Sequence, residues 1–355
     1  MVVDLAPADH EVLSRRLRKE YPNTYLVMDP GVFSYFLLST FSRYSNAYPF
    51  FVKVGYTHRL IHRLSVSRPL RRRLSLGVLK LFSHVTNPAH WNPRSWLPPW
   101  VKPEDVDLVL VVDPVVCRLN LRIFRNAVKI YWAQDCVYEK TRYMHLTLLS
   151  GSDYDHVLVA HRGCIKEYEE LTGAKVSWLP YAFYPEIHRP LGLEETLDLS
   201  FLGGLDWVGA EKRRRIIELI RSKRPGLRFY VSSRNFLNHM VAIYNMSKVV
   251  LNISRIGEMN WRDFEVLGCG RPMIRDYSAE VSEIFSDGEH LVMFRDEEDL
   301  LEKIDELIRN KEKRERIALK GRQEALEKHT LDHRVGRILE IAGLLDDKSI
   351  PRWPR

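Results

Sequence analysis

Short apolar runs alternate with stretches of helical periodicity along the first half of the chain. Each run has the length of a buried strand, and the residues between several of the runs suit amphipathic helices. The runs lie at 25–28, 107–112, 128–132, 156–160 and 176–179. This alternation predicts an N-terminal α/β domain.

The same alternation returns in the second half with closer spacing. Helices are expected at 212–221 and 238–246, and a helical tail from Glu297 has Thr330 as the expected N-cap of its last helix. Strands and helices that alternate in this way predict a parallel, doubly wound sheet. The strand-length runs lie at 197–202, 227–231, 249–253, 272–274 and 291–294.

Three prolines separate the two alternations. Pro180, Pro185 and Pro190 interrupt the regular pattern, because proline continues neither a helix interior nor a central strand. We place an interdomain linker there. It divides the chain into a Rossmann-like domain at 1–185, a second Rossmann-like domain at 186–340 and a tail at 341–355, sizes that are usual for α/β domains.

The composition is that of a folded globular protein. Hydrophobic residues make up 45% and charged residues 28% of the 355 residues, which excludes a disordered or collagenous chain. The four cysteines form no metal-ligand or disulfide pattern, which indicates a reducing, cytoplasmic setting and no metal site. No signal peptide or membrane-spanning run is expected. Glutamine is scarce beside abundant Lys, Arg and Glu, a balance typical of thermophilic proteins.

A glycine pair follows the expected strand at 197–202. Gly203 and Gly204 would let the backbone approach a diphosphate closely, and the helix expected to open near Gly209 would offer free N–H groups and partial positive charge. Arg213 could add a side-chain clamp. The alternative is that the glycine pair only makes a turn.

A more specific signal lies in the segment NWRDFEVLGCGRPMIRD. Glu265 is expected in the first turn of a short helix that ends at the Gly268/Gly270 pair, with Pro272 opening the next strand. Its carboxylate would then face the crevice beyond the strand ends and accept hydrogen bonds from the vicinal hydroxyls of a ribose. The alternative is a solvated carboxylate that pairs with Arg262.

The chain resembles the glycosyltransferase group 1 family, in particular its spore-maturation-type branch. The resemblance extends over about 128–339 and rests on the runs VVLNIS, MNWRDFEVLGCGRPMIRDY, EIFSDGEHLVMF and HTLDHRVGRIL. It implies the GT-B fold, two Rossmann-like domains that face a cleft, and a nucleotide-diphosphate sugar donor with no obligatory metal. It also implies that Glu265 contacts the donor ribose and that Gly203 and Gly204 lie beside the diphosphate, in a donor site to which we add Arg213, Arg262 and Gly270.

One position departs from the family pattern. Many retaining relatives have a second glutamate eight residues before the ribose-binding one, near the donor sugar, and Gly257 occupies that position here. Glu258 is displaced by one residue and is kept as a catalytic candidate. The sequence therefore does not decide between a retaining and an inverting outcome.

Two further catalytic candidates follow strands of the N-terminal half. Asp135 ends the run VKIYWAQD and His161 follows HVLVA, so both are expected at the strand ends that face the cleft. A carboxylate or an imidazole there can act as the base for an acceptor hydroxyl. The alternatives are that Asp135 caps a helix and that His161 is a residue of the cleft wall whose hydrogen bonds are all formed within the protein.

The net charge of +8 comes from one segment. Eleven Lys and Arg and no acidic residue lie between Asp29 and Glu104, so the rest of the chain sums to −3. We expect an insertion at about 31–102. Within 59–80, arginines lie beside an apolar helical face, the layout of a helix that binds an anionic membrane or an anionic acceptor. The alternative is a helix packed on its own domain with a solvated basic face. The apolar positions are Leu70, Leu74, Val78 and Leu81, and the arginines are Arg71, Arg72 and Arg73.

These features together predict a metal-independent glycosyltransferase without a bound cofactor. It would move a sugar from a nucleotide-diphosphate sugar to the hydroxyl of a glycan, lipid or protein acceptor, in the cytoplasm or on the inner face of the membrane. The alternatives are a nucleotide-sugar epimerase of the same fold, a sugar-binding protein without turnover, and a nucleic-acid-binding protein. The sequence contains no nucleic-acid-binding motif in support of the last.

Overall fold

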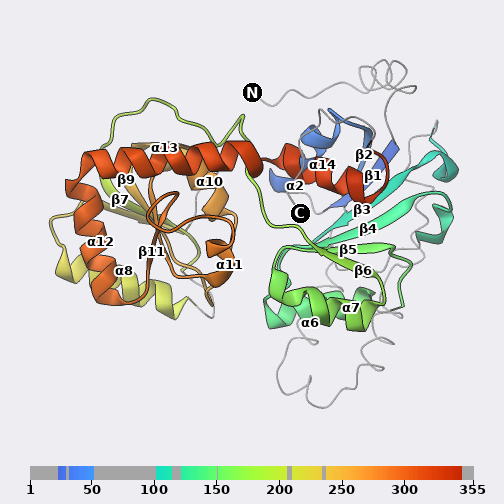
Figure 1. Cartoon of the computed structure of the whole chain (residues 1–355), viewed down its shortest axis with the longest axis horizontal. Helices are drawn as coiled ribbons and strands as arrows, with labels where there is room; N and C mark the ends of the chain where they lie inside the picture. The colour runs from blue at the N-terminus through green and yellow to red at the C-terminus, as the bar shows by residue number, and fades with distance from the viewer. Residues whose placement is uncertain are drawn as a thin grey trace, which may run out of the picture. The chain divides into compact units, whose positions relative to one another are not determined.

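The structure is a computed structural model of the chain that describes residues 23–28, 32–51, 101–113, 121–149, 151–205, 210–233 and 237–345 (Figure 1). The described residues form two compact units. Unit 1 extends to Pro180 and resumes at Val335, and unit 2 is Tyr181–Arg334. The chain thus passes between the units twice, once after β6 and once within α14.

Unit 1 contains a six-stranded sheet in the order β2-β1-β3-β4-β5-β6, and every described pairing in it is parallel. All five residues of β3 are buried, as expected for a central strand with both faces covered. The strands are β1 (Asn23–Met28), β2 (Asn46–Phe51), β3 (Leu108–Val112), β4 (Val128–Ala133), β5 (His156–Val159) and β6 (Lys175–Trp178), and the helices are α2 (Val32–Phe41), α6 (Glu139–Leu149) and α7 (Ile165–Thr172).

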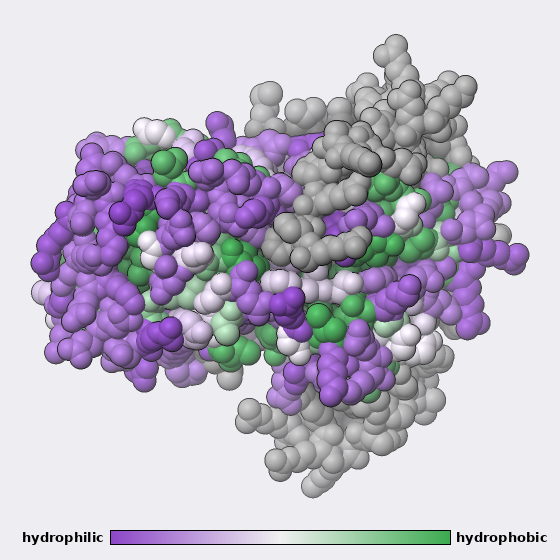
Figure 2. Space-filling view, in the orientation of Figure 1, coloured by the Kyte–Doolittle hydropathy of each residue, from purple (hydrophilic) through white to green (hydrophobic). Residues whose placement is uncertain are grey.

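Unit 2 contains a five-stranded parallel sheet in the order β11-β10-β9-β7-β8. Figure 2 shows mainly hydrophilic residues over its surface, with smaller hydrophobic areas. The strands are β7 (Leu197–Leu202), β8 (Phe229–Ser232), β9 (Ser247–Asn252), β10 (Met273–Asp276) and β11 (Val292–Phe294), and the helices are α8 (Glu211–Lys223), α9 (Leu237–Met246), α10 (Arg262–Gly268), α11 (Ala279–Ser282), α12 (Glu297–Arg309) and α13 (Lys311–Lys328). The helix α14 (Leu331–Ile341) begins in unit 2 and belongs to unit 1 from Val335 onward.

Helices cover both faces of the unit 2 sheet. Alternate side chains of a strand point to opposite faces, so β9 shows which helices lie on which side. Leu251 packs in one apolar cluster with residues of α8 and α12. The next residue, Asn252, instead hydrogen-bonds Asp263 of α10. The sheet is therefore doubly wound, and the prediction of two parallel α/β sheets is confirmed.

The expected insertion at 31–102 is wrong in its first part. α2 and β2 lie within it, and β2 pairs in parallel with β1, so residues 32–51 belong to the sheet. The strand NAYPFF was hard to recognise because it contains Pro49, which removes a backbone donor. An edge strand tolerates this loss, and β2 is the edge of its sheet.

Two other sequence expectations have different outcomes. The basic helix expected at 59–80 lies outside the described residues. The last helix, α14, begins directly after Thr330, whose hydroxyl lies 2.7 Å from Nδ1 of His333. Within the part of the chain that the structure describes, no helix combines the length and apolar character needed to cross a bilayer.

Candidate functional site

The glycine turn after β7 is shaped by an arginine that lies against it. The Gly203 amide donates to the Ser232 carbonyl across to β8, at 3.0 Å. A Cβ added to Gly203 would lie 2.8 Å from Nη2 of Arg262 and 3.0 Å from Cζ of Phe201. Only glycine therefore leaves room for the Arg262 guanidinium at this turn.

Arg213 holds two strand ends together from the first turn of α8. Its side chain is buried and donates through Nε to the Ile253 carbonyl (2.9 Å) and through Nη1 to the Gly204 carbonyl (3.2 Å). These bonds join the turn after β7 to the loop after β9. The structure thus places this predicted diphosphate clamp as a support of the glycine turn.

Glu265 lies in the first turn of α10, as predicted, and α10 ends at Gly268 just before the turn that leads to β10. Its side chain is 17% exposed, and its Oε1 lies 3.7 Å from Nε2 of His188. Within the described part of the chain, no hydrogen bond to this carboxylate is formed. Burial lowers the pKa of His188, an effect that the nearby Glu265 partly opposes.

The proton of His188 can be assigned from its surroundings. Nδ1 accepts the Tyr184 amide at 3.2 Å, so the neutral ring carries its proton on Nε2, which faces Glu265. Tyr244 also lies near this carboxylate, and burial raises the pKa of its phenol. Glu265 therefore lies near two buried polar groups, and no described residue donates a hydrogen bond to its carboxylate.

The alternative in which Glu265 pairs with Arg262 is wrong. Nη1 of Arg262 donates to Oδ1 of Asn252 at the end of β9, and its guanidinium lies 5.5 Å from the centre of the Phe201 ring. Arg262 thus spans from α10 to the glycine turn. It is the cation that the structure brings closest to Gly203 among the predicted donor-site residues.

Gly270 acts on the backbone after α10. Its φ is 67°, a left-handed conformation that glycine adopts without strain. A Cβ there would lie 3.0 Å from Cδ of Arg322 and 3.3 Å from Cγ of Pro190. The structure thus packs Gly270 against the side chains of α13 and of the segment before β7.

Glu258 is occupied by its own loop. Its carboxylate accepts the Arg255 amide at 2.9 Å and the Ile256 amide at 2.7 Å, and its side chain is buried. The intervening Gly257 has a φ of 93°, which lets the chain turn back on the carboxylate. The structure thus gives this predicted catalytic residue an organising role in the loop after β9.

Sequence reasoning missed the charged cluster beneath that loop. Asp276, which ends β10, accepts the amide of Ser254 at 2.8 Å and also its hydroxyl. Nζ of Lys212 lies 2.7 Å from Oδ2 of the same carboxylate. Arg275 and Asp263 form a fully buried ion pair at 2.6 Å beside it. No sequence signal marks these residues, because their partners are distant along the chain.

The two candidates of unit 1 lie on neighbouring strand ends. Asp135 is exposed just after β4, and its amide donates to Oδ2 of Asp113 at 2.8 Å. His161 is buried just after β5. The thiol of Cys136 lies between Cys164 and the backbone of His161, and burial, with Cys164 next, raises the pKa of that thiol. Cys136 thus joins the two loops.

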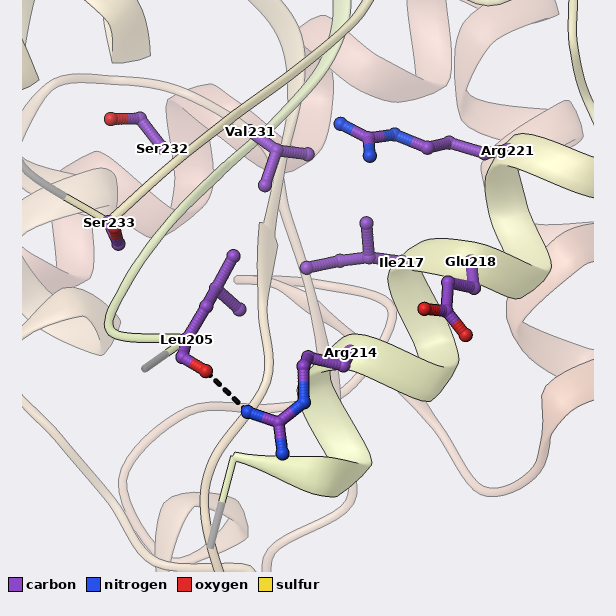
Figure 3. A pocket seen from close by; sticks show the side chains of 8 residues that line it. All are labelled: Leu205, Arg214, Ile217, Glu218, Arg221, Val231, Ser232 and Ser233. Carbon is purple, nitrogen blue, oxygen red and sulfur yellow. Dashed lines mark hydrogen bonds between the residues drawn. The ribbon is translucent and has the colours of Figure 1, made fainter. Parts of the chain in front are cut away.

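A groove of about 470 Å³ lies beside α8 (Figure 3). Arg214 crosses it to donate to the Leu205 carbonyl. The groove borders the glycine turn, because its lining residue Ser232 accepts the Gly203 amide. Its lining residues are Leu205, Arg214, Ile217, Glu218, Arg221, Val231, Ser232 and Ser233. In the described ranges, no group of three His, Cys, Asp or Glu side chains is arranged to hold a metal ion.

Comparison with protein families matches residues 212–340 to a family described as glycosyl transferase-like. Residues 212–340 are thus similar to a glycosyltransferase domain. The prediction of a glycosyltransferase is confirmed by this match, which covers most of unit 2. A search of curated protein sequences finds no match.

Several solved structures share the fold over about nine tenths of this chain. Sucrose-phosphate synthase from Thermosynechococcus elongatus has a TM-score of 0.57 at 11% identity, over 90% of this chain and 98% of that one. Alr3699/HepE from Anabaena in complex with UDP-glucose has a TM-score of 0.56 at 13% identity, over 91% and 100%. A glycosyltransferase from Rickettsia africae ESF-5 has a TM-score of 0.53 at 11% identity, over 92% and 100%. The chain therefore has the GT-B fold, as predicted.

Proposed function

We propose that the protein transfers a sugar from a nucleotide-diphosphate sugar to an acceptor hydroxyl without a metal ion or a bound cofactor. The observation that carries this proposal is the Glu265 carboxylate, which is mostly buried at the start of α10 and accepts no hydrogen bond from the described residues. Such a carboxylate can accept both vicinal hydroxyls of a ribose. The UDP-glucose complex of Alr3699/HepE supports a nucleotide-sugar donor.

Arg262 is our candidate for the cation at the diphosphate. Its guanidinium lies against Gly203, where the backbone can approach a phosphate closely. Arg213, by contrast, is committed to two carbonyls. When the bond between the sugar carbon and the diphosphate oxygen breaks, a fixed cation stabilises the negative charge that the leaving group retains. This replaces the role that we expected for Arg213.

Asp135 is the proposed base on the acceptor side. Its exposed side chain follows β4, where it can take the proton of the acceptor hydroxyl as that oxygen bonds to the sugar carbon. His161 is buried beside the same loop and is the second candidate. Asp135→Asn is therefore expected to abolish transfer while donor affinity stays unchanged, with His161→Ala as the comparison.

We also propose membership of the spore-maturation-type branch. Two of the segments that carry the resemblance contact each other in unit 2. Phe264 belongs to MNWRDFEVLGCGRPMIRDY and His329 to HTLDHRVGRIL, and their ring centres lie 5.5 Å apart. Arg334 lies 5.8 Å from the centre of the Phe264 ring and donates to the carbonyls of Tyr181 and Lys328. Motif residues that are far apart in sequence thus build one buried contact.

The basic residues within 59–80 lead us to propose attachment to an anionic membrane surface on the cytoplasmic side. Each basic residue near an anionic leaflet contributes about 1 kcal/mol to binding. Sedimentation with anionic vesicles should therefore show weaker binding of a triple Ala variant of Arg71, Arg72 and Arg73 than of the unchanged protein. Equal binding of the two proteins contradicts the proposal.

A donor screen tests the proposed function. A ligand that binds only the folded protein raises its melting temperature, so one class of nucleotide-diphosphate sugar should stabilise the protein, with or without a chelator. NMR of the products with candidate acceptors then separates transfer from epimerisation of the donor alone. The proposal fails if no nucleotide sugar raises the melting temperature and none is consumed.

A further inference from the structure

A chain of buried polar side chains runs through unit 1 to the loop that carries Asp135. Oδ2 of Asp113, which directly follows β3, accepts the Asp135 amide at 2.8 Å. Its Oδ1 lies 2.8 Å from Nε2 of His145 on α6, and Nδ1 of His145 lies 2.8 Å from the hydroxyl of Tyr168 on α7. His145 and Tyr168 are fully buried, and Asp113 is 5% exposed.

The two end groups of this hydrogen-bonded series determine which group donates and which accepts in each bond. An amide can only donate, so Oδ2 of Asp113 accepts from Asp135. Burial, then the charges nearby, raises the pKa of Tyr168, so this phenol keeps its proton and donates it to Nδ1 of His145. Nε2 of His145 therefore carries the ring proton and donates to Oδ1 of Asp113. Each hydrogen bond fixes the direction of the next.

Packing holds the imidazole in the same position. The ring of Tyr131 on β4 meets His145 edge-on at 5.5 Å between ring centres, and Tyr168 does so at 6.3 Å. The end of β3, α6 and α7 are thus linked through His145, and the second oxygen of Asp113 accepts the amide of Asp135. A buried polar network whose members all have partners is rigid, so it can fix the position of the loop that it holds.

We propose that Asp113, His145 and Tyr168 are positioning residues that fix the Asp135 loop for the acceptor-side step. This inference rests on the proposed function, in which Asp135 is the base. Asp113 acts through the amide of Asp135 and not on the substrate. The carboxylate of Asp135 then keeps one orientation, and a misplaced base lowers the rate of transfer much more than it lowers donor affinity.

The first experiment does not depend on transferase activity. Hydrogen exchange at the Asp135 amide, followed by NMR in the full-length protein, is expected to be about tenfold faster or more in Asp113→Asn, because the charged acceptor is lost. Tyr168→Phe removes one hydroxyl at the far end of the chain and is expected to accelerate the same exchange by a smaller factor. Unchanged exchange in both variants overturns the proposal. If Asp113→Asn does not fold, Tyr168→Phe alone decides.

The second experiment separates positioning from a general loss of structure. In both variants kcat should fall, about tenfold or more for Asp113→Asn, while KM for the donor and its calorimetric Kd stay unchanged. His156→Gln is the control, because His156 belongs to the same unit but hydrogen-bonds Ser177, which is not a partner of Asp113 among the described residues. A kcat for both variants equal to that of the control overturns the proposal.

The two proposals can fail separately. If the unchanged protein transfers no sugar from any donor, the proposed function fails, while the exchange experiment still decides whether Asp113 holds the Asp135 amide. If the unchanged protein is active and Asp135→Asn is inactive, but Asp113→Asn and Tyr168→Phe keep full kcat, positioning fails and the proposed function stands.

Discussion

The two units use the same device at the carboxyl ends of their strands, with different partners. In unit 1, Asp113 after β3 accepts the amide of Asp135 in the loop after the neighbouring β4. In unit 2, Asp276 at the end of β10 accepts the amide of Ser254 in the loop after the neighbouring β9. A buried carboxylate thus fixes the loop of the adjacent strand in each sheet.

The difference lies in the side chains that contact each carboxylate. Asp113 accepts from the buried His145, whereas Asp276 pairs with the buried Arg275 and with Lys212, whose side chain is 36% exposed. Burial alone would raise the pKa of Asp276, but the two cations outweigh it and lower that pKa. In unit 2, Arg275 and Lys212 lie at the strand ends where we place the anionic donor. In unit 1, the hydrogen-bonded series of Asp113, His145 and Tyr168 contains no Lys or Arg and lies where we place the neutral acceptor hydroxyl. The charges at the strand ends of each unit therefore match the substrate that we propose for that unit.

Asp276→Ala should have the largest effect. It leaves Arg275 and Lys212 without this carboxylate and frees the Ser254 amide, and breaking a buried ion pair costs about 3–5 kcal/mol. Urea denaturation should show this loss, and nucleotide affinity should fall with it. Asp113→Asn should instead leave nucleotide affinity unchanged. Equal loss of nucleotide affinity in both variants would remove the distinction between the two units.

Gly203→Ala should have a smaller and more local effect. The new Cβ would lie 2.8 Å from Nη2 of Arg262, the flexible end of a side chain, so the guanidinium shifts while the fold persists. Nucleotide affinity is expected to fall about tenfold, the loss of one charge-assisted contact. Gly226→Ala is the matched control in the same unit, because its Cβ would meet no atom within 4 Å. Calorimetric titration with nucleoside diphosphates compares the two.

His156 should give the smallest effect, in the pH dependence of stability. Burial, aided by Lys175 and Arg337, lowers its pKa to about 4. Between pH 4 and about 6.5 the unfolded chain binds the proton more readily than the folded chain, so the free energy of unfolding decreases as the pH falls. His156→Gln should reduce this dependence by on the order of 1 kcal/mol, after allowance for solvent screening. Urea denaturation at pH 7 and pH 4.5 measures it.

The sequence revealed features that depend on local pattern. Its apolar runs located every described strand except β2 to within two residues of its ends, and the segment before Gly268 placed Glu265 in the first turn of α10. The orientation of side chains depends on contacts that are distant in sequence. Glu258 turns to its own loop because Gly257 adopts a positive φ, and Asp113 meets Asp135 only after β3 and β4 pair. The sequence around each of these residues therefore does not predict its partner.

The central claim is that Glu265 holds the ribose of the donor nucleotide. Glu258, seven residues earlier, is its matched control, because its carboxylate is already occupied by backbone amides. Calorimetric titration of a nucleoside diphosphate should show a roughly 10- to 150-fold weaker Kd for Glu265→Gln, the loss of a charge-assisted hydrogen bond of about 1.5 to 3 kcal/mol. Glu258→Gln should weaken binding less. An unchanged Kd for Glu265→Gln would contradict the account and place the nucleotide elsewhere.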